Sequence, residues 1–218
     1  MGDDPDHVKD VPDHIEHTVL GPATTWDDVT ETLDTALEFG MRACIPPCYV
    51  ERATTYTPTV DVTTVIDFPH GQRSVTANCC EAERAWQDGA SELDLVANIG
   101  YLRAGEDERL ETELREVVAA VPLPVKVIVE APLLTTEELH HVCEIATDAD
   151  AAFLKTATGF SNGGATVEDV ETMSEYLPVK ASGGVDSWAF AEELFAAGAA
   201  RIGASSGETI VREYREVY

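Results

Sequence analysis

Short apolar runs rich in β-branched residues alternate along the chain with longer, acid-bearing stretches of helical period. Apolar runs of about four to eight residues between turn signals are typical of buried strands. Their alternation with helical segments indicates repeated strand–helix units and a parallel sheet. The predicted strands cover residues 15–20, 42–45, 60–67, 92–97, 125–130, 152–156, 178–182 and 201–204.

The stretches between these runs carry helix start and stop signals. A hydroxyl-bearing residue precedes five of them and can supply the oxygen that caps a helix N-terminus. Gly40, Gly89 and Gly198 follow three of them, where a left-handed C-cap is expected. The predicted helices cover residues 26–39, 75–87, 137–146, 167–176 and 188–196, after Thr25, Ser74, Thr136, Thr166 and Ser187.

Eight strand–helix units in 218 residues give about 27 residues per unit, near the lower end of the roughly 200 to 400 residues of a (β/α)8 barrel. The sequence therefore predicts an α/β fold, a single-domain (β/α)8 TIM barrel over residues 1–218. Residues 1–13 are expected to be an N-terminal extension and residues 208–218 a C-terminal helix or tail. The alternative, an open doubly wound sheet, usually has fewer strands and a GxGxxG turn after its first strand, which residues 19–22 (VLGP) lack.

The charge balance is strongly acidic. Fourteen Lys and Arg against 41 Asp and Glu give a net charge of −27, and the only lysines are Lys9, Lys126, Lys155 and Lys180. A surface of this sign repels nucleic acid and anionic lipid, so we expect neither partner. Because the acidic residues are spread over every predicted helix, we interpret them as the solvated surface of a halophile's protein. An ordinary acidic protein, or one with an acidic partner-binding face, is the alternative.

The sequence contains no targeting or metal-binding signal. No run approaches about 20 apolar residues, and the acidic start, Met1 to Asp4, lacks the basic and apolar segments of a signal peptide. We therefore expect a cytoplasmic protein. Its five cysteines, an odd number, are expected to be reduced, and Cys44 and Cys48 have no CxxC, HxxxH or HExxH spacing beside them. We expect no metal and no other cofactor.

Three of the four lysines lie inside predicted strands: Lys126, Lys155 and Lys180. A lysine buried among apolar residues must be paired with an acid or lose its proton, because burial disfavours the charged form. An amine whose pKa is lowered by burial and by a second ammonium group is the nucleophile that forms a Schiff base with an aldehyde or ketone. Strands six and seven are neighbours in a barrel, so we expect Lys155 and Lys180 to meet over the cavity. A salt bridge at the barrel base is the alternative.

Proton transfer beside an imine requires an acid–base group. Asp94 alternates with apolar residues in the predicted strand 92–97, which directs its side chain into the barrel. Its alternative, a buried ion pair with a lysine, is compatible with this role. Glu130 and Glu16 are weaker candidates of the same kind.

Three turns rich in glycine and hydroxyl residues follow the last three strands, at residues 158–164, 182–184 and 203–207. Backbone amides in such turns can approach an anion, and the loops after strands seven and eight are the usual phosphate site of this barrel. The sequence thus predicts phosphate binding, although each turn alone could be a tight connection. Residues 203–207 also match the GxSxG motif of serine hydrolases, but the catalytic histidine of that family follows the serine and the last histidine here is His141.

Together these segments resemble the deoxyribose-phosphate aldolase family, class I aldolases with a TIM-barrel fold. The resemblance runs from about residue 14 to residue 210. Its most specific segments contain the lysines, at 153–161 (FLKTATGFS) and 179–185 (VKASGGV). The other matching segments are 15–20 (IEHTVL), 44–50 (CIPPCYV), 65–71 (VIDFPHG), 92–100 (ELDLVANIG), 163–166 (GGAT) and 201–207 (RIGASSG).

The resemblance implies reversible cleavage of 2-deoxy-D-ribose 5-phosphate to D-glyceraldehyde 3-phosphate and acetaldehyde, without a metal. It implies that Lys155 forms the Schiff base, that Lys180 tunes it and that Asp94 relays protons through water. Family members are often dimers, so we expect a homodimer or a higher homo-oligomer. With the glycine-rich turns, the resemblance assigns substrate or phosphate contacts to Thr18, Cys44, Thr156, Gly159, Gly183, Gly184, Ser205 and Ser206.

Three positions depart from the family pattern. Glu16 replaces the usual Asp, Ala157 a Ser or Thr, and Pro46 the Asn of many members, which bears on contacts to substrate hydroxyls rather than on the imine chemistry. Some members end in a tyrosine thought to assist proton transfer, and this chain ends in Tyr218. Two other functions stay open: another imine-forming aldolase or transaldolase, which would keep Lys155, and a non-catalytic phosphosugar-binding protein.

Overall fold

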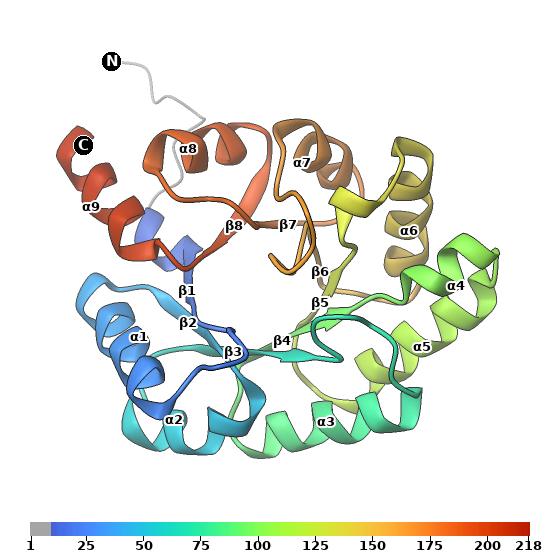
Figure 1. The fold of residues 1–218 in the computed structure, drawn as a ribbon, viewed down its shortest axis with the longest axis horizontal. Helices are drawn as coiled ribbons and strands as arrows, with labels where there is room; N and C mark the ends of the chain where they lie inside the picture. The colour runs from blue at the N-terminus through green and yellow to red at the C-terminus, as the bar shows by residue number, and fades with distance from the viewer. Residues whose placement is uncertain (1–9) are drawn as a thin grey trace.

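The computed structural model describes residues 10–218, in which eight parallel strands form a closed barrel surrounded by helices (Figure 1). Each strand pairs with its neighbours in sequence, and β8 closes on β1. The predicted single-domain (β/α)8 TIM barrel is confirmed and the open-sheet alternative is excluded. The strands are β1 Ile15–Thr18, β2 Arg42–Ile45, β3 Val62–Ile66, β4 Glu92–Val96, β5 Val125–Ile128, β6 Phe153–Lys155, β7 Val179–Ser182 and β8 Ala199–Ala204.

Helices cover the outside of the barrel. They are α1 Trp26–Phe39, α2 Val50–Tyr56, α3 Val75–Gln87, α4 Ile99–Ala104, α5 Asp107–Ala120, α6 Thr136–Asp148, α7 Val167–Ser174, α8 Trp188–Ala196 and α9 Gly207–Val217, with short 3-10 helices η1 Val11–His14, η2 Pro47–Tyr49 and η3 Ala131–Leu133. Within residues 10–218, none of the helices has both the length and the apolar composition needed to cross a membrane.

Helices α2, α4 and α5 were not predicted from the sequence. The first two contain seven and six residues, too few to show a helical period. Helix α5 does contain the pattern, since Leu110, Leu114 and Val117 are buried at helical spacing. Its high content of acidic residues obscured that pattern.

Side-chain hydrogen bonds cap most of the predicted helices at the expected residue: Thr25, Thr166 and Ser187. Helix α6 begins one residue earlier than predicted, because Thr135 and not Thr136 is its N-cap. The reason is the position of Glu138, which lies three residues after Thr135 and completes a reciprocal capping box with it. Ser74 makes no side-chain hydrogen bond at the start of α3.

Both ends of the described chain pack against the barrel. Of the expected N-terminal extension, residues 1–9 lie outside the described residues, whereas Val11 in η1 is 1% exposed and belongs to the core. The packed structure therefore begins before the predicted boundary at residue 13. The C-terminal segment forms α9, whose Ile210 and Val211 are fully buried.

Alternation along the strands sends apolar side chains toward the helices and polar side chains into the barrel. In β4, Leu93 and Leu95 belong to the apolar core, while Asp94 forms ion pairs in the barrel interior. Gly203 in β8 makes room for this interior, since a Cβ there would lie 2.7 Å from Cε of Lys180. The apolar core is thus a ring between barrel and helices, and charged side chains fill the barrel itself.

Helix α5 carries a buried acid outside the barrel interior. Glu113 is 4% exposed, and its Oε1 has no hydrogen-bond partner among residues 10–218. Burial and then the negative charge of Asp67 raise the pKa of Glu113 to about 7, against the opposing effect of Arg109. This carboxyl group is therefore only partly ionised at neutral pH.

Glu113→Gln is expected to stabilise the protein at about pH 8 by on the order of 1–2 kcal/mol relative to its effect at about pH 5. The folded-state pKa lies above the unfolded value, so the bound proton favours folding at low pH and this contribution is lost as pH rises through 7. Urea unfolding in molar potassium chloride would measure the difference. Glu116→Gln, an exposed position on the same helix, is the control. An equal gain at both pH values would contradict titration of Glu113 near neutrality.

Candidate active site

Asp94 is the centre of the charged barrel interior. Its Oδ2 accepts hydrogen bonds from Nζ of Lys155 at 2.8 Å and Nζ of Lys180 at 2.7 Å, and its Oδ1 accepts one from Nζ of Lys126 at 3.1 Å. The strand register places Asp94 beside Lys126 and Lys155 beside Lys180. The structure thus brings Lys155 and Lys180 together through one shared carboxylate oxygen. Lys180 does not reach open space, however: it is fully buried in ion pairs with Glu16 and Asp94, which agrees with the salt-bridge alternative.

A second group of charges continues this network toward the beginning of the strands. Glu16 accepts a hydrogen bond from Lys180 and lies 3.5 Å from Lys126 and 3.4 Å from Arg201. Glu92 lies 2.5 Å from Nζ of Lys126 and 3.3 Å from the guanidinium group of Arg201. Each of these buried charges therefore has a partner of opposite sign, as a low-dielectric interior requires.

Mutual attraction fixes the ionisation of this network. Burial alone would raise the pKa of a carboxyl group, but the three lysines hold the pKa of Asp94 well below its ordinary value, and Lys126 and Lys180 lower the pKa of Glu16. Burial alone would lower the pKa of an amine, but Asp94 and Glu16 raise the pKa of both Lys180 and Lys126. Both acids and these two lysines are therefore charged at neutral pH.

Lys155 differs from the other two buried lysines because it borders a cavity. This cavity has a volume of about 270 Å³ and lies where β1, β6, β7 and β8 end. Neither Lys126 nor Lys180 is among its lining residues. The lining residues are Thr18, Leu20, Gly21, Lys155, Thr158, Gly159, Phe160, Ser182, Gly183, Gly184, Val185, Asp186, Gly203, Ala204, Ser205 and Ser206. Lys155 thus donates a hydrogen bond to a buried carboxylate and also borders open space.

The glycine-rich turns form the rest of the cavity wall, and they require glycine to pack. A Cβ on Gly164 would lie 2.3 Å from the carbonyl oxygen of Gly183, so the turns after β6 and β7 can meet only without that side chain. Helix α9 begins at Gly207, immediately after Ser206, and adds partial positive charge from its N-terminus. Lys155 is the one lysine or arginine in the lining, so an anion here would depend on backbone amides and hydroxyl groups.

Two residues expected at the substrate do not reach this cavity. The side chain of Thr156 is fully buried and bonded to the backbone of Ser182, donating to its carbonyl oxygen at 2.8 Å and accepting from its amide at 2.9 Å. Cys44 is fully buried beside Glu16 and Asp94, and burial raises the pKa of its thiol. Thr156 and Cys44 therefore build the barrel wall, whereas Thr18 does line the cavity.

Glu130 also lies outside the lysine network. It was considered as a second acid–base group, but the structure places it in a neighbouring cavity, with its carboxylate bonded to Thr158 and Ser161. Tyr218 is at the end of α9, where its hydroxyl donates to Glu192 at 2.9 Å, and it is not among the lining residues.

Several residues of the site were not assigned from the sequence. Phe160 and Asp186 line the cavity within or just after turns that the sequence analysis had singled out. Glu92 and Arg201 extend the ion network, and each lies two residues from another inward-facing position, Asp94 and Gly203. The period of two along a strand was the signal that could have found them.

The described residues contain one group of three side chains whose potential metal-binding atoms lie close together: Glu16, Cys44 and Asp94. The carboxylates of Glu16 and Asp94 already bind the buried ammonium groups of Lys126 and Lys180. A metal ion would have to displace those groups, so the chemistry of this donor set fits lysine rather than a metal.

Comparisons with known proteins agree with this geometry. Residues 15–213 match the model of the DeoC/LacD family of aldolases. A deoxyribose-phosphate aldolase of Haloarcula marismortui is 63% identical over 208 residues, which are 95% of this chain and 90% of that protein. The structure of an aldolase called QR15 superposes with a TM-score of 0.92 at 35% identity, covering 96% of this chain and 97% of that one. A deoxyribose phosphate aldolase from Aeropyrum pernix, described as a unique tetramer, has a TM-score of 0.87 at 28% identity, covering 95% and 92%.

Proposed function

Because the chain belongs to the DeoC/LacD family of aldolases, we propose that it cleaves 2-deoxy-D-ribose 5-phosphate reversibly to D-glyceraldehyde 3-phosphate and acetaldehyde. The observation that carries this proposal is the position of Lys155, which borders the cavity while its ion partner, Asp94, is fully buried. An amine in that position can form a Schiff base, the electron sink of a class I aldolase.

The cleavage proceeds through covalent attachment to Lys155. Its neutral Nζ attacks the aldehyde carbon C1 of the open-chain sugar to give a carbinolamine. Uptake of a proton and loss of water from the carbinolamine then give a protonated imine. The C3 hydroxyl then loses its proton, the C2–C3 bond breaks, and the electron pair of that bond moves into the imine to form an enamine. D-Glyceraldehyde 3-phosphate leaves, and protonation of C2 followed by addition of water releases acetaldehyde and restores the amine.

Lys180 and Asp94 are proposed to support this chemistry from the barrel interior. Lys180 stays charged, and its ammonium group shares one carboxylate oxygen of Asp94 with Lys155, from where it is proposed to tune the attacking amine. Asp94 touches both lysines through Oδ2, and we propose that it relays protons through water. Because the lysines hold its pKa so low, its protonated form would be short-lived.

Borohydride reduction in the presence of deoxyribose 5-phosphate or acetaldehyde is expected to attach the substrate fragment to Lys155. Peptide mass spectrometry would identify the modified residue. Excess chelator should leave the yield unchanged, because the amine supplies the electron sink that a metal gives other aldolases. Lys155→Ala should form no adduct.

Other results of the trapping experiment favour the alternatives. An adduct on Lys126 or Lys180 would assign the Schiff base to that lysine instead of Lys155. The absence of any adduct would favour a non-catalytic phosphosugar-binding protein. Turnover of ketose phosphates, with none of deoxyribose 5-phosphate, would favour another imine-forming aldolase or a transaldolase.

Lys180→Leu is expected to slow adduct formation near neutral pH by about tenfold or more, because it removes the buried positive charge that shares Asp94 with Lys155. An amine attacks an aldehyde only without its proton, so higher pH should restore part of the rate if Lys180 acts through its charge. Trapping rates across a pH series would measure this, with circular dichroism to verify folding. A uniform loss at every pH would mean that Lys180 does more than supply charge.

We also propose that the protein is a homodimer or a higher homo-oligomer. The Aeropyrum pernix relative is described as a tetramer, and Leu37, Tyr56 and Trp86 are 53%, 49% and 43% exposed on the described chain. Large exposed apolar side chains are enriched where subunits meet. Sedimentation in molar salt should give at least twice the mass of the chain, and a monomer at every concentration would contradict this proposal.

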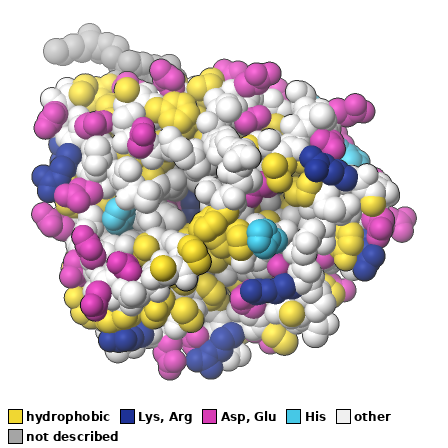
Figure 2. Space-filling view, viewed as in Figure 1, with side chains coloured by type: hydrophobic (Ala, Val, Ile, Leu, Met, Phe, Trp, Pro, Cys, Tyr) yellow, Lys and Arg dark blue, Asp and Glu magenta, His cyan; other side chains and the backbone are white. Residues whose placement is uncertain are grey.

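Folding stability and substrate affinity are expected to rise from dilute buffer to molar potassium chloride. Acidic side chains are spread around the face in Figure 2, and the net charge is −27. The Debye length falls from about 30 Å at about 0.01 M salt to about 3 Å at about 1 M, so repulsion within the protein and against a phosphate ester is screened. Thermal midpoints and KM across this range would test it. Flat or falling stability would contradict the halophile interpretation.

A further inference from the structure

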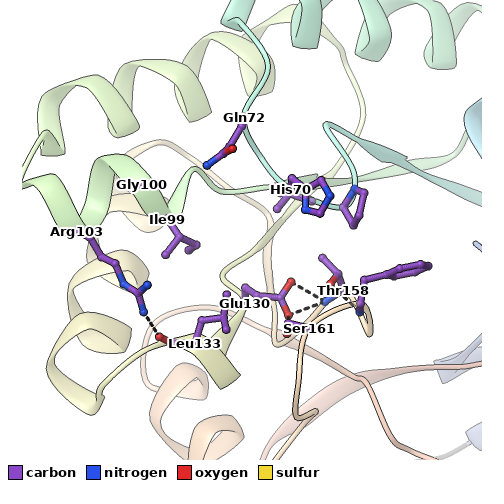
Figure 3. Close-up of a pocket in the computed structure, with 12 residues that line it drawn as sticks. His70, Gln72, Ile99, Gly100, Arg103, Glu130, Leu133, Thr158 and Ser161 are labelled. Carbon is purple, nitrogen blue, oxygen red and sulfur yellow. Dashed lines mark hydrogen bonds between the residues drawn. The ribbon is translucent and has the colours of Figure 1, made fainter.

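A second cavity lies beside the one that Lys155 borders. It has a volume of about 330 Å³, and Figure 3 shows Glu130, His70, Gln72 and Arg103 around it. Thr158 and Phe160 line both cavities. Residues 158–161, here called the wall loop, therefore separate the two cavities, and they begin three residues after Lys155.

Glu130 holds the wall loop from the side of the second cavity. Its carboxylate accepts the amide hydrogen of Thr158 at 3.2 and 3.3 Å and the hydroxyl hydrogen of Ser161 at 2.8 Å (Figure 3). Within the loop, Oγ1 of Thr158 accepts from the amide of Phe160 at 3.1 Å. The Phe160 ring in turn meets the Phe68 ring edge-on at 5.2 Å between centroids. The loop is thus fixed at both ends of its short span.

The backbone of Glu130 is strained in the conformation that makes these bonds possible. Its φ of 54° lies in the left-handed region, which glycine adopts readily and a residue with a long side chain does not. Such strain persists where the surroundings hold the residue in place. Glu130 is 4% exposed and is not among the residues lining the Lys155 cavity. The contribution of the Glu130 side chain to the structure is therefore its set of hydrogen bonds to the wall loop.

We propose that Glu130 is a positioning residue that keeps the wall loop in the shape that phosphosugar binding requires. This inference rests on the proposed function and assigns Glu130 to substrate affinity rather than to chemistry at Lys155. Because Lys155 is the one lysine or arginine in the cavity lining, affinity depends on how the neutral groups of the loops are placed. Lys155 itself is held separately by β6 and Asp94, so loss of the anchor leaves the amine in position.

Glu130→Gly is the principal variant, because it removes the carboxylate and relieves the left-handed backbone. KM for deoxyribose 5-phosphate is expected to rise about fivefold or more, while kcat changes less than about twofold. Acetaldehyde is too small to need the wall loop, so its borohydride-trapped adduct at Lys155 should form at the parent rate. Glu130→Gln should keep most of the affinity that Glu130→Gly loses. Glutamine retains one side-chain oxygen, and Oε1 of Glu130 by itself accepts hydrogen bonds from both Thr158 and Ser161.

Two further variants complete the experiment. Ser161→Ala removes one of the anchoring bonds and should raise KM by a smaller factor, and it decides the question if Glu130→Gly does not fold. Gln72→Ala is the matched control, because Gln72 lines the second cavity and has no hydrogen bond to the wall loop in the described chain.

An unchanged KM in Glu130→Gly, or in Ser161→Ala where the first variant is unfolded, would overturn the positioning role. Loss of acetaldehyde trapping in step with loss of sugar cleavage would also overturn it, because Glu130 would then act at Lys155 itself. Failure of the proposed function gives a different result, since the parent protein would then neither cleave the sugar nor form an adduct.

Discussion

The carboxylate of Asp94, shared among three lysine ammonium groups, is the interaction on which the barrel interior depends. A buried charge costs several kcal/mol unless it is paired, so the strands that carry Lys126, Lys155 and Lys180 must face β4 in one register. A slip of one residue would turn Asp94 toward the helices and leave the lysines without their partner. The ion pairs that link these four strands in the barrel interior are therefore also the contacts that position Lys155, the proposed nucleophile.

This arrangement separates stability from chemistry. The apolar ring between barrel and helices can stabilise the fold without any of the interior charges, because it is built from the opposite face of each strand. Replacing a buried ion network by apolar residues of similar volume is often neutral or stabilising in other proteins. The charged interior is thus better explained by its chemistry, since it presents one lysine to a cavity and keeps the two beneath it protonated.

The sequence was sufficient to predict the barrel, because strand period, glycine turns and length all agreed. It was also sufficient to predict that Lys155, Lys180 and Asp94 lie inside the barrel, because a chain that avoids lysine on its surface makes the lysines in its strands conspicuous. The ion partners were harder to predict. Glu16 and Lys180 are 164 positions apart, and only closure of β8 on β1 brings their strands near each other.

The structure differs from the sequence-based expectations for Thr156 and Glu130, and in both cases the reason is the backbone at the end of a strand. Strand β6 ends at Lys155, so period two already places Thr156 on the opposite face, bonded to Ser182. For Glu130 the same period predicts an inward side chain, but β5 ends at Ile128 and the left-handed backbone at Glu130 turns the carboxylate toward the neighbouring cavity. The φ angle of Glu130 thus decides whether its carboxylate contacts the lysines or the wall loop. The alternation of side chains along a strand does not specify that angle.

The acidic surface and the anionic substrate make opposite demands, and the two operate over different distances. The field of a net charge of −27 extends over tens of ångströms in dilute buffer and opposes the approach of any phosphate ester. Hydrogen bonds from backbone amides and serine hydroxyls operate at about 3 Å. Molar salt shortens the Debye length to about that distance, so it removes the long-range repulsion while leaving the short contacts intact. The proposed phosphate site, built from glycine turns and a helix N-terminus with one lysine in its lining, is therefore suited to a protein that works in concentrated salt.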